Sequence, residues 1–333
     1  MILLLGATGY VGQSFARALR RRKDSFIPLS RNAFDYTKFE FLFDYVRKIR
    51  PELVINAAEY SCSEDSGEDC PEVDRLEMLQ ANSLLPQTIS RVCAMTNTPW
   101  GHVSSGSIYT GARVLHDKLT RIEKNLTQLR IHDLFDLHPE AFFGFSEEDE
   151  PNFCFKHPPC TFYSGTKALA EESIRNQGQS YIWRLRLAFN EEEDPSNFLL
   201  RAQRWSKIHD AIESLSHLDD CVGACLQLWD RRAPFGVYNV VNPGAITTRE
   251  VITMIQQILR PAMKFKCLED DEPSRENEAP NSHCILDGSK LFKAGIRLRQ
   301  VKEALEYSLQ KLQSQHPALM KSAAQRLSVG GLG

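Results

Sequence analysis

The chain has 333 residues, of which 42% are hydrophobic and 25% are charged, as in ordinary globular proteins. Its 40 basic and 43 acidic residues nearly cancel, which argues against a protein that binds nucleic acid through a basic surface. No apolar run reaches the roughly 18 residues that a membrane span needs, and the apolar start at 2–5 is too short for a signal-peptide core. The 9 cysteines lack paired spacing, which predicts reduced thiols in a cytoplasmic protein and neither a disulfide framework nor a metal site.

Short apolar runs alternate with amphipathic segments along most of the chain. A buried strand is predicted at 2–5, and a helix with Val11, Phe15 and Leu19 on one side follows it. This alternation predicts an α/β fold, a Rossmann-type doubly wound parallel sheet with right-handed crossovers. The other predicted strands are 25–29, 53–55, 99–104, 181–189 and 237–241, and the other predicted helices are 39–49, 83–95 and 163–175.

Two segments interrupt the alternation. Residues 112–140 carry leucines and isoleucines at helical spacing, which predicts one amphipathic helix inserted after a strand. Residues 267–282 are acidic and are predicted to form a loop. The small residues after about 316 predict a flexible tail.

A glycine-rich loop directly follows the first predicted strand and opens the first predicted helix. Its first glycine permits a tight turn, its second lets the backbone approach a pyrophosphate, and its third allows close packing of the helix on the strand. Because the helix N-terminus also favours an anion, the loop predicts dinucleotide binding. The candidate cofactor contacts in this loop are Gly6, Thr8, Gly9, Tyr10, Val11 and Gly12.

The residues after the second strand indicate which dinucleotide is bound. An acidic residue at this place binds the ribose 2′-hydroxyl of NAD, whereas an arginine accepts the 2′-phosphate of NADP. The chain has Ser30 and Arg31 here, which favours NADP(H) over NAD(H), although Arg31 could also be a solvated loop charge. Asp35 is placed either to bond the adenine or to cap the next helix.

Tyr163 and Lys167 lie one helical turn apart in a predicted helix. A nearby ammonium favours the tyrosinate, so we expect Lys167 to lower the phenol pKa of Tyr163 and make it a usable general acid or base. Such a pair is commonly no more than a surface contact. The glycine loop and the segment Asn56-Ala57-Ala58, which ends a buried strand, favour the functional interpretation.

Two serines follow the strand predicted at 99–104. The carboxyl end of a strand is where an open α/β sheet binds ligands, and both Ser105 and Ser107 lie there. Ser105 is placed to hydrogen-bond a reacting oxygen together with Tyr163.

Together these motifs resemble the extended short-chain dehydrogenase/reductase family, and within it the dTDP-4-dehydrorhamnose reductase-like branch. The similarity is greatest to the epimerase/reductases that make nucleotide-linked L-rhamnose, and it covers about residues 1–310. The stretches that carry it are Arg50-Pro-Glu-Leu-Val-Ile-Asn-Ala-Ala58, Glu148-Asp-Glu-Pro-Asn-Phe153, Phe162-Tyr-Ser-Gly-Thr-Lys-Ala168, Arg184-Leu-Arg186, Asp194-Pro-Ser-Asn-Phe198, Asn242-Pro-Gly244, Ala279-Pro-Asn-Ser282 and Leu286-Asp287.

The resemblance implies a reductase mechanism. In the family, NADPH delivers hydride to C4 of a 4-keto-6-deoxy sugar attached to a nucleoside diphosphate. By resemblance, Tyr163 protonates the developing alkoxide, Lys167 holds the nicotinamide ribose and Ser105 fixes the keto oxygen. Asn82 matches an asparagine that supports the active-site backbone. The other implied contacts are Asn56, Ala57, Ala58, Asn82 and Tyr163 for the cofactor, and Ser107, Asn197, Arg201 and Asn281 for the substrate.

The chain departs from the family at positions that matter for epimerisation and for the diphosphate. Cys70 fits the place of a cysteine that rhamnose-type relatives carry, which makes it a catalytic candidate. Those relatives use a lysine as partner acid where this chain has Arg201, and an arginine donates its proton poorly. Because acidic neighbours also raise a thiol pKa, we expect strong 4-keto reduction and weak epimerisation. Asn281 replaces an arginine that contacts the diphosphate in the family, and Arg275 is the nearby alternative.

The sequence therefore predicts an NADPH-dependent reductase of a nucleotide-linked 4-keto-6-deoxy sugar, with C3/C5 epimerase activity left open. One alternative is a nucleotide-sugar epimerase or dehydratase that keeps NAD bound, which Arg31 disfavours; another is a non-catalytic NADP-binding regulatory subunit. We expect an NADP-binding domain at 1–189, a smaller, partly interleaved substrate-binding part at 190–315 and the tail at 316–333. The expected partner is a nucleotide sugar, with no membrane or nucleic acid, and a homodimer is compatible with the sequence.

Overall fold

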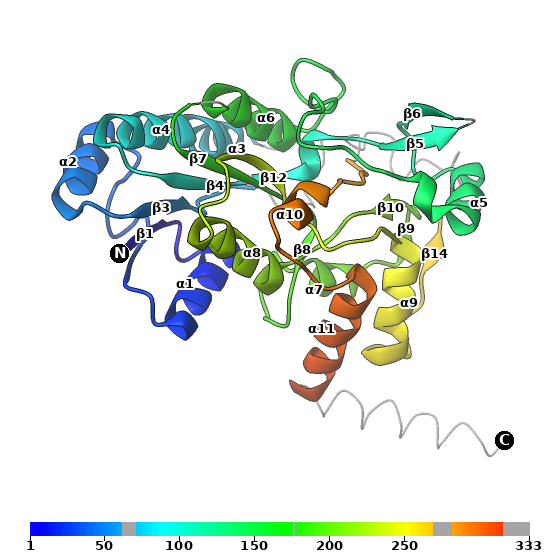
Figure 1. The fold of residues 1–333 in the computed structure, drawn as a ribbon. Helices are drawn as coiled ribbons and strands as arrows, with labels where there is room; N and C mark the ends of the chain where they lie inside the picture. Colours follow the sequence, from blue (N-terminus) through cyan, green and yellow to red (C-terminus); the bar gives the residue numbers. More distant parts are fainter. Residues whose placement is uncertain (62–70, 117, 176, 269–281, 316–333) are drawn as a thin grey trace.

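A six-stranded parallel sheet forms the centre of the computed structural model, which describes residues 1–61, 71–116, 118–175, 177–268 and 282–315. The strands lie in the order β12 (Gly236–Asn239), β7 (Ser180–Leu185), β4 (Trp100–Ser105), β3 (Leu53–Asn56), β1 (Ile2–Leu5) and β2 (Phe26–Leu29) (Figure 1). The order reverses direction between β1 and β3, and an open α/β sheet binds ligands at such a switch point. The predicted doubly wound parallel sheet is confirmed.

Helices cover both faces of this sheet (Figure 1). One face carries α1 (Tyr10–Arg22) and α8 (Leu218–Asp230), which pack against each other. The other face carries α2 (Phe39–Ile49), α4 (Leu85–Thr96) and α6 (Phe162–Ile174).

The side chains of β1 alternate between the two faces. Ile2 and Leu4 belong to the cluster that contains α1 and α8, whereas Leu3 and Leu5 belong to the cluster of α2 and α4. Both faces of β1 are therefore buried, which explains its unbroken apolar sequence.

The helical segment before β4 starts earlier than predicted. It comprises α3 (Glu72–Leu79), a π-helical stretch at Gln80–Leu84 and α4, whereas the sequence predicted a helix around 83–95. The first part shows no clear buried stripe, since its Val73 is 73% exposed. The π-helical stretch buries Asn82, and such stretches frequently occur at functional sites.

The prediction of a single amphipathic helix at 112–140 is wrong. The segment forms an antiparallel hairpin of β5 (Ala112–His116) and β6 (Leu119–Glu123), followed by the short helix α5 (Leu129–Leu137). Leu119 and Ile122 are 60% and 52% exposed, so their helical spacing marks no buried face.

The same insertion is anchored on the C-terminal part of the chain. Leu126 and Ile131 are buried in one cluster with Ile212 and Ile285. In addition, the backbone N–H of Ile212 donates to the carbonyl oxygen of Leu126 at 3.3 Å. The hairpin and α5 are thus packed against the C-terminal part.

The strand predicted at 181–189 is broken after Leu185. Leu187 adopts a left-handed conformation (φ 40°), and the two-residue strand β8 (Ala188–Phe189) leaves the central sheet. The chain returns to the sheet later as β12, so the sheet draws on residues beyond 189. The domain division at 189 stays a prediction.

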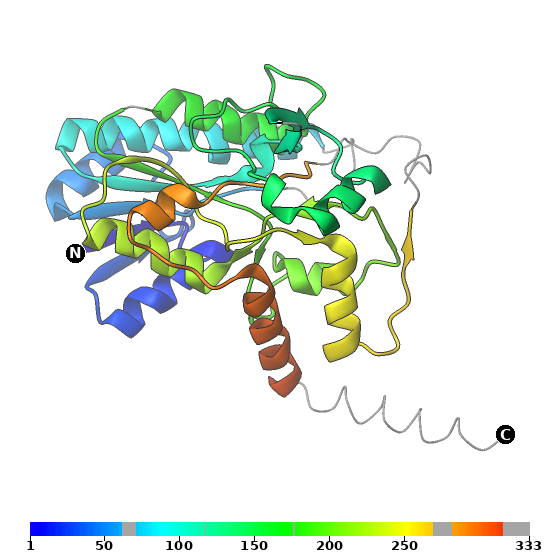
Figure 2. The same ribbon diagram turned by 45° about the vertical axis from the view of Figure 1, so that its right-hand side comes forward.

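The C-terminal part has its own core. Here α9 (Thr248–Ile258) and α11 (Val301–Gln315) lie side by side (Figure 2) and bury Ile252 and Leu305 together with Phe198. The remaining elements are α7 (Phe198–Ala202), β9 (Lys207–Ile208), β10 (Ile212–Glu213), β11 (Ser216–His217), β13 (Ile246–Thr247), β14 (Lys266–Cys267), α10 (Ser289–Lys293) and the short 3-10 helices at Gly106–Ile108 and Pro139–Ala141. None of the described helices is long and apolar enough to cross a membrane.

Candidate active site

Two glycines of the loop after β1 are required because neighbouring backbone atoms leave no room for a side chain. Gly6 has φ 75°, and a Cβ there would lie 2.4 Å from the backbone nitrogen of Ala58. A Cβ on Gly12 would lie 2.0 Å from the carbonyl oxygen of Gly6. These glycines therefore allow the loop, the start of α1 and the segment after β3 to pack closely at the switch point.

The protein atoms around Gly9 leave room for a side chain. A Cβ there would meet only the carbonyl oxygen of Gly6, at 3.6 Å, which is an ordinary contact. Gly9 is also the N-cap of α1, whose first turn has neither a capping side chain nor an acidic residue. This helix end fits an anionic group such as a dinucleotide phosphate.

The side chains around Gly9 take different roles. The Tyr10 hydroxyl donates to Oδ1 of Asn190 at 2.8 Å, and Val11 packs against the core on the sheet face that carries α1 and α8. The exposed Thr8 offers its carbonyl oxygen to the side chain of Gln13 at 2.9 Å. Because the side chains of Tyr10 and Val11 make contacts within the protein, their backbone N–H groups are the atoms that can bind a phosphate.

The turn after β2 places the predicted selectivity residues on the surface. Arg31 Nη1 lies 2.9 Å from Oε2 of Glu77 on α3, and both side chains are well exposed. Ser30 offers its carbonyl oxygen to the N–H groups of the turn that follows it. Asp35 accepts hydrogen bonds from the hydroxyl and the N–H of Thr37, which lower its pKa. Since Lys38 is the N-cap of α2, Asp35 closes the turn before the helix instead of capping it.

We expect Arg31→Ala to weaken NADPH binding by about 1.5–3 kcal/mol, the range for hydrogen bonds to charged groups. NADH lacks the 2′-phosphate, so its affinity should stay nearly unchanged. Glu77→Gln removes the carboxylate next to Arg31 and should strengthen NADPH binding slightly. Fluorescence titration of both dinucleotides measures these effects, and equal losses for NADPH and NADH in Arg31→Ala would count against the assignment.

The Tyr163–Lys167 pair stands at the start of α6. Thr161 fixes this helix end, because its hydroxyl accepts the N–H of Ser164 at 3.0 Å. Lys167 is fully buried, and its Nζ donates to the carbonyl oxygen of Val103 at 3.4 Å. The pair is bridged by Glu59, which follows β3: its Oε2 lies 3.0 Å from the Tyr163 hydroxyl and 2.8 Å from Lys167 Nζ.

The expected lowering of the Tyr163 pKa by Lys167 is wrong for this arrangement. Burial raises the phenol pKa well above its usual range, and the negative charge of Glu59 and its hydrogen bond raise it further. A hydrogen bond with Ser105 and the charge of Arg186 act in the opposite direction. Tyr163 therefore keeps its proton at neutral pH and can act as a donor.

The two serines at the end of β4 lie beside this pair. Ser105 caps the 3-10 turn that follows it, since its Oγ accepts the N–H of Ser107 at 3.1 Å. The two hydroxyls are 3.0 Å apart. Arg186, just beyond β7, donates to the Ser107 hydroxyl at 3.2 Å. This buried guanidinium is held by Glu213 at 2.8 Å, which also contacts His283 Nδ1 at 2.7 Å.

Two buried asparagines support the backbone around the site. Asn56 accepts the N–H of Ala58 at 3.1 Å, and its amide nitrogen donates to Nδ1 of His102, also at 3.1 Å. Asn82 binds the backbone of Tyr60 twice, accepting its N–H at 3.0 Å and donating to its carbonyl oxygen at 2.8 Å. These contacts fix the segment between Ala58 and Tyr60, from which Glu59 projects.

The other predicted substrate residues are not all near this cluster. Asn197 is buried and caps α7, and its amide nitrogen donates to the carbonyl oxygens of Asn190 and Glu192, both at 2.8 Å. Arg201 lies in the last turn of α7. Cys70 and Asn281 lie outside the described residues. Their substrate or catalytic roles stay predictions.

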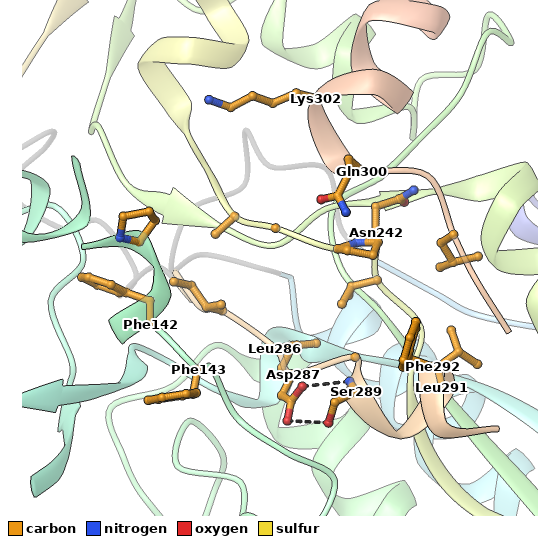
Figure 3. A pocket seen from close by; sticks show the side chains of 18 of the residues that line it. Phe142, Phe143, Asn242, Leu286, Asp287, Ser289, Leu291, Phe292, Gln300 and Lys302 are labelled. Carbon is orange, nitrogen blue, oxygen red and sulfur yellow. Dashed lines mark hydrogen bonds between the residues drawn. The ribbon is translucent and has the colours of Figure 1, made fainter. Parts of the chain in front are cut away.

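A separate cavity of about 810 Å³ lies between the insertion and the C-terminal segments (Figure 3). Phe142, Phe143 and Phe292 form much of its apolar wall, and Lys302 projects from α11 on another side. Among the described catalytic candidates, Ser105, Tyr163 and Lys167 do not line this cavity. It adjoins the site through Leu286, whose side chain would contact a Cβ placed on Gly106 at 2.6 Å.

The sequence motifs did not point to four residues that the structure places in the site: Glu59, Arg186, Glu213 and His283. The available signal was position: Glu59 follows Asn56-Ala57-Ala58, and Arg186 follows a buried strand, so both stand at carboxyl ends of parallel strands. Glu213 and His283 come from distant segments, and no local pattern links them to Arg186.

Curated relatives resemble this chain over part of their own length. A trifunctional UDP-glucose 4,6-dehydratase/UDP-4-keto-6-deoxy-D-glucose 3,5-epimerase/UDP-4-keto-L-rhamnose-reductase of Arabidopsis thaliana is 25% identical over 305 residues, which is 91% of this chain. The chain spans only 41% of the length of that relative.

Solved structures share the fold. The L780 UDP-rhamnose synthase of Acanthamoeba polyphaga mimivirus has a TM-score of 0.75 at 17% identity and covers 93% of this chain and 98% of its own. A dTDP-4-dehydrorhamnose reductase of Bacillus anthracis str. Ames in complex with NADP has a TM-score of 0.69 at 17% identity, covering 92% of this chain and 97% of its own.

A family model described as the RmlD substrate binding domain matches residues 1–314. This match extends from the glycine loop through the Tyr163–Lys167 helix to α11, and so includes all the motifs from which the resemblance was inferred. The chain therefore belongs to the RmlD substrate binding domain family, as its resemblance to the dTDP-4-dehydrorhamnose reductase-like branch implied.

Proposed function

We propose that this chain is an NADPH-dependent reductase of the 4-keto group of a 6-deoxy sugar attached to a nucleoside diphosphate. The observation that carries the proposal is the convergence of Tyr163, Lys167 and Ser105 beside the switch point of the sheet. The names of the similar proteins support it, since they describe a UDP-4-keto-L-rhamnose reductase, a UDP-rhamnose synthase and a dTDP-4-dehydrorhamnose reductase.

Three side chains have separate roles in the reduction of the keto group. NADPH supplies the hydride when it is bound. The Tyr163 hydroxyl gives its proton to the oxygen as negative charge develops there, and Ser105 holds the same oxygen with a hydrogen bond. Lys167 stabilises the tyrosinate that remains and holds the nicotinamide ribose. These contacts strengthen as the ketone becomes an alkoxide, so they lower the barrier instead of merely tightening binding.

The cofactor preference rests on the turn after β2 and on the glycine loop. Arg31 is a surface cation that can accept a 2′-phosphate, and the helix end at Gly9 suits a pyrophosphate. The reductase of Bacillus anthracis, which has the same fold, was solved with NADP. Ser107, Asn197, Arg201 and Asn281 remain the proposed contacts of the nucleotide sugar.

The decisive assay measures NADPH consumption by the purified chain with UDP- and dTDP-linked 4-keto-6-deoxy sugars. The proposal predicts oxidation of NADPH that depends on the sugar nucleotide and is much slower with NADH. A second candidate function is a non-catalytic NADP-binding subunit, which the contact between Glu59 and the Tyr163 proton favours. Tight NADPH binding with no consumption for any sugar nucleotide would support that candidate and contradict the first.

Epimerisation is expected to be weak, because Arg201 returns a proton poorly and acidic residues surround Cys70 in the sequence. We expect little deuterium at C3 or C5 when the 4-keto substrate is incubated with the chain and NADPH in D₂O. An incubation without the protein is the control. Rapid exchange at both carbons that is lost in Cys70→Ala would show a full epimerase/reductase instead.

We also propose a cytoplasmic location. The seven described cysteines are free thiols, which suits a reducing compartment. A homodimer is the assembly that we propose to test, and light scattering of the purified chain measures it.

A further inference from the structure

Glu59 contacts both polar ends of the Tyr163–Lys167 pair. Its Oε2 accepts the Tyr163 hydroxyl at 3.0 Å and lies 2.8 Å from Lys167 Nζ. A tyrosine hydroxyl has one proton, so it cannot donate to Glu59 and to a second oxygen at the same time. One carboxylate oxygen thus occupies the single Tyr163 proton that a carbonyl reduction needs, together with one of the three N–H donors of Lys167.

The backbone of Glu59 is held on both sides. Before it, the side chain of Asn56 accepts the N–H of Ala58 at 3.1 Å. After it, the Asn82 amide binds both the N–H and the carbonyl oxygen of Tyr60. The contact with α6 is therefore built into the end of β3 and does not come from a loose loop.

The carboxylate is the member of this trio that can move. The Glu59 side chain is 38% exposed, whereas the Lys167 side chain is fully buried. Rotation of Glu59 towards solvent leaves α6 in place, and water can hydrate the released carboxylate. The buried ammonium of Lys167 has no such route, because its position is set by the helix.

We propose that Glu59 is a positioning residue that competes with the dinucleotide and the keto oxygen for Lys167 and Tyr163, and thereby sets the affinity of the site for NADPH. The inference rests on the proposed function, since that function assigns Lys167 to the nicotinamide ribose. The Tyr163 proton serves a keto oxygen only after the Glu59 carboxylate has turned away, and the same movement frees the Lys167 donor that Glu59 holds.

The charge states of the trio agree with this competition. Loss of water around the Glu59 carboxylate where it meets Lys167 and Tyr163 tends to raise its pKa, but the charge of Lys167 and the hydrogen bonds from both residues outweigh this effect and lower the pKa overall. Burial and Glu59 raise the phenol pKa of Tyr163, against opposing effects of Ser105 and Arg186. At neutral pH the carboxylate is thus ionised and the phenol protonated, so the contact is at full strength.

The first test measures NADPH affinity by calorimetry. Glu59→Gln keeps the shape and removes the charge, so we expect its NADPH Kd to fall about tenfold, since two charge-assisted contacts no longer compete. Glu59→Asp keeps the charge on a shorter side chain, and its Kd should lie between those of Glu59→Gln and the wild type. Glu306→Gln, an exposed carboxylate on α11, changes the net charge equally and should leave the Kd unchanged. An unchanged or higher Kd in Glu59→Gln would overturn the proposal.

The second test follows the Tyr163 phenol by NMR of ring-labelled tyrosine, in protein without added dinucleotide. Tyr163→Phe assigns the signal. We expect the phenol to titrate at lower pH in Glu59→Gln than in the wild type, a change that a merely structural role of Glu59 would not produce. The two tests separate the possible failures. No NADPH binding by any variant overturns the proposed function and the competition with it, whereas equal binding by wild type and Glu59→Gln overturns the competition alone.

Discussion

Tyr163→Phe is expected to lower kcat by about 10²–10⁴-fold while NADPH affinity stays nearly intact. The substitution keeps the aromatic ring on α6 and removes the proposed proton donor, the hydroxyl that hydrogen-bonds with Ser105. Steady-state reduction of a 4-keto-6-deoxy sugar nucleotide gives kcat, and calorimetry gives the NADPH Kd.

Tyr307→Phe is the matched control for this experiment. Tyr307 lies on α11 and is 42% exposed, so the loss of its hydroxyl should change neither kcat nor the Kd. A Tyr163→Phe variant that retains most of the wild-type kcat would remove Tyr163 from the proposed proton-donor role.

Glu171→Ala is expected to lower the free energy of unfolding by about 3–5 kcal/mol, because it leaves a buried charge without its partner. Glu171 Oε2 lies 2.7 Å from Arg184 Nη2, and Glu171 Oε1 accepts the Ser104 hydroxyl at 2.5 Å. The side chains of Glu171 and Arg184 are only 3% and 0% exposed. The network ties α6 to β4 and β7 directly behind Ser105, so the variant should also lose activity.

The neighbouring residue offers a control for the same measurement. Glu172 pairs with Lys156 on the surface at 2.5 Å, and both side chains are more than half exposed. Glu172→Ala should therefore cost about 0–1 kcal/mol. Urea unfolding of both variants gives the comparison, and similar losses in the two would show that burial does not govern the Glu171 network.

The parts of the fold that the sequence predicted well depend on local patterns. The apolar run of β1 is buried on both faces, and Gly6 and Gly12 are required because a Cβ there would lie 2.4 Å and 2.0 Å from neighbouring backbone atoms. Strand burial and tight turns can be predicted from patterns of a few residues, such as an apolar run or a glycine at a fixed position. The alternation of strand and helix predicted the doubly wound parallel sheet, whereas the order of its six strands came from the structure.

The parts that the sequence did not predict depend on contacts between distant segments. The helical spacing of leucines and isoleucines in 112–140 predicted an amphipathic helix. The segment instead begins with the hairpin of β5 and β6, in which Leu119 and Ile122 are exposed. Glu59 and Tyr163 are 104 positions apart, and only the packing of α6 on the end of β3 brings them together. The Tyr163 pKa is therefore raised, first by burial and then by Glu59, and both effects depend on the packing of α6 and not on the local sequence around Tyr163.

The most direct test of the proposed reduction follows the hydride itself. NADPH that carries deuterium at the transferable position of the nicotinamide is incubated with the chain and a UDP- or dTDP-linked 4-keto-6-deoxy sugar. NMR and mass spectrometry of the recovered sugar nucleotide locate the label. We expect one deuterium at C4 of the reduced sugar, with Tyr163→Phe giving a far lower yield in the same time. A sugar nucleotide recovered as the unlabelled ketone, with the labelled NADPH unconsumed, would contradict the proposed reduction.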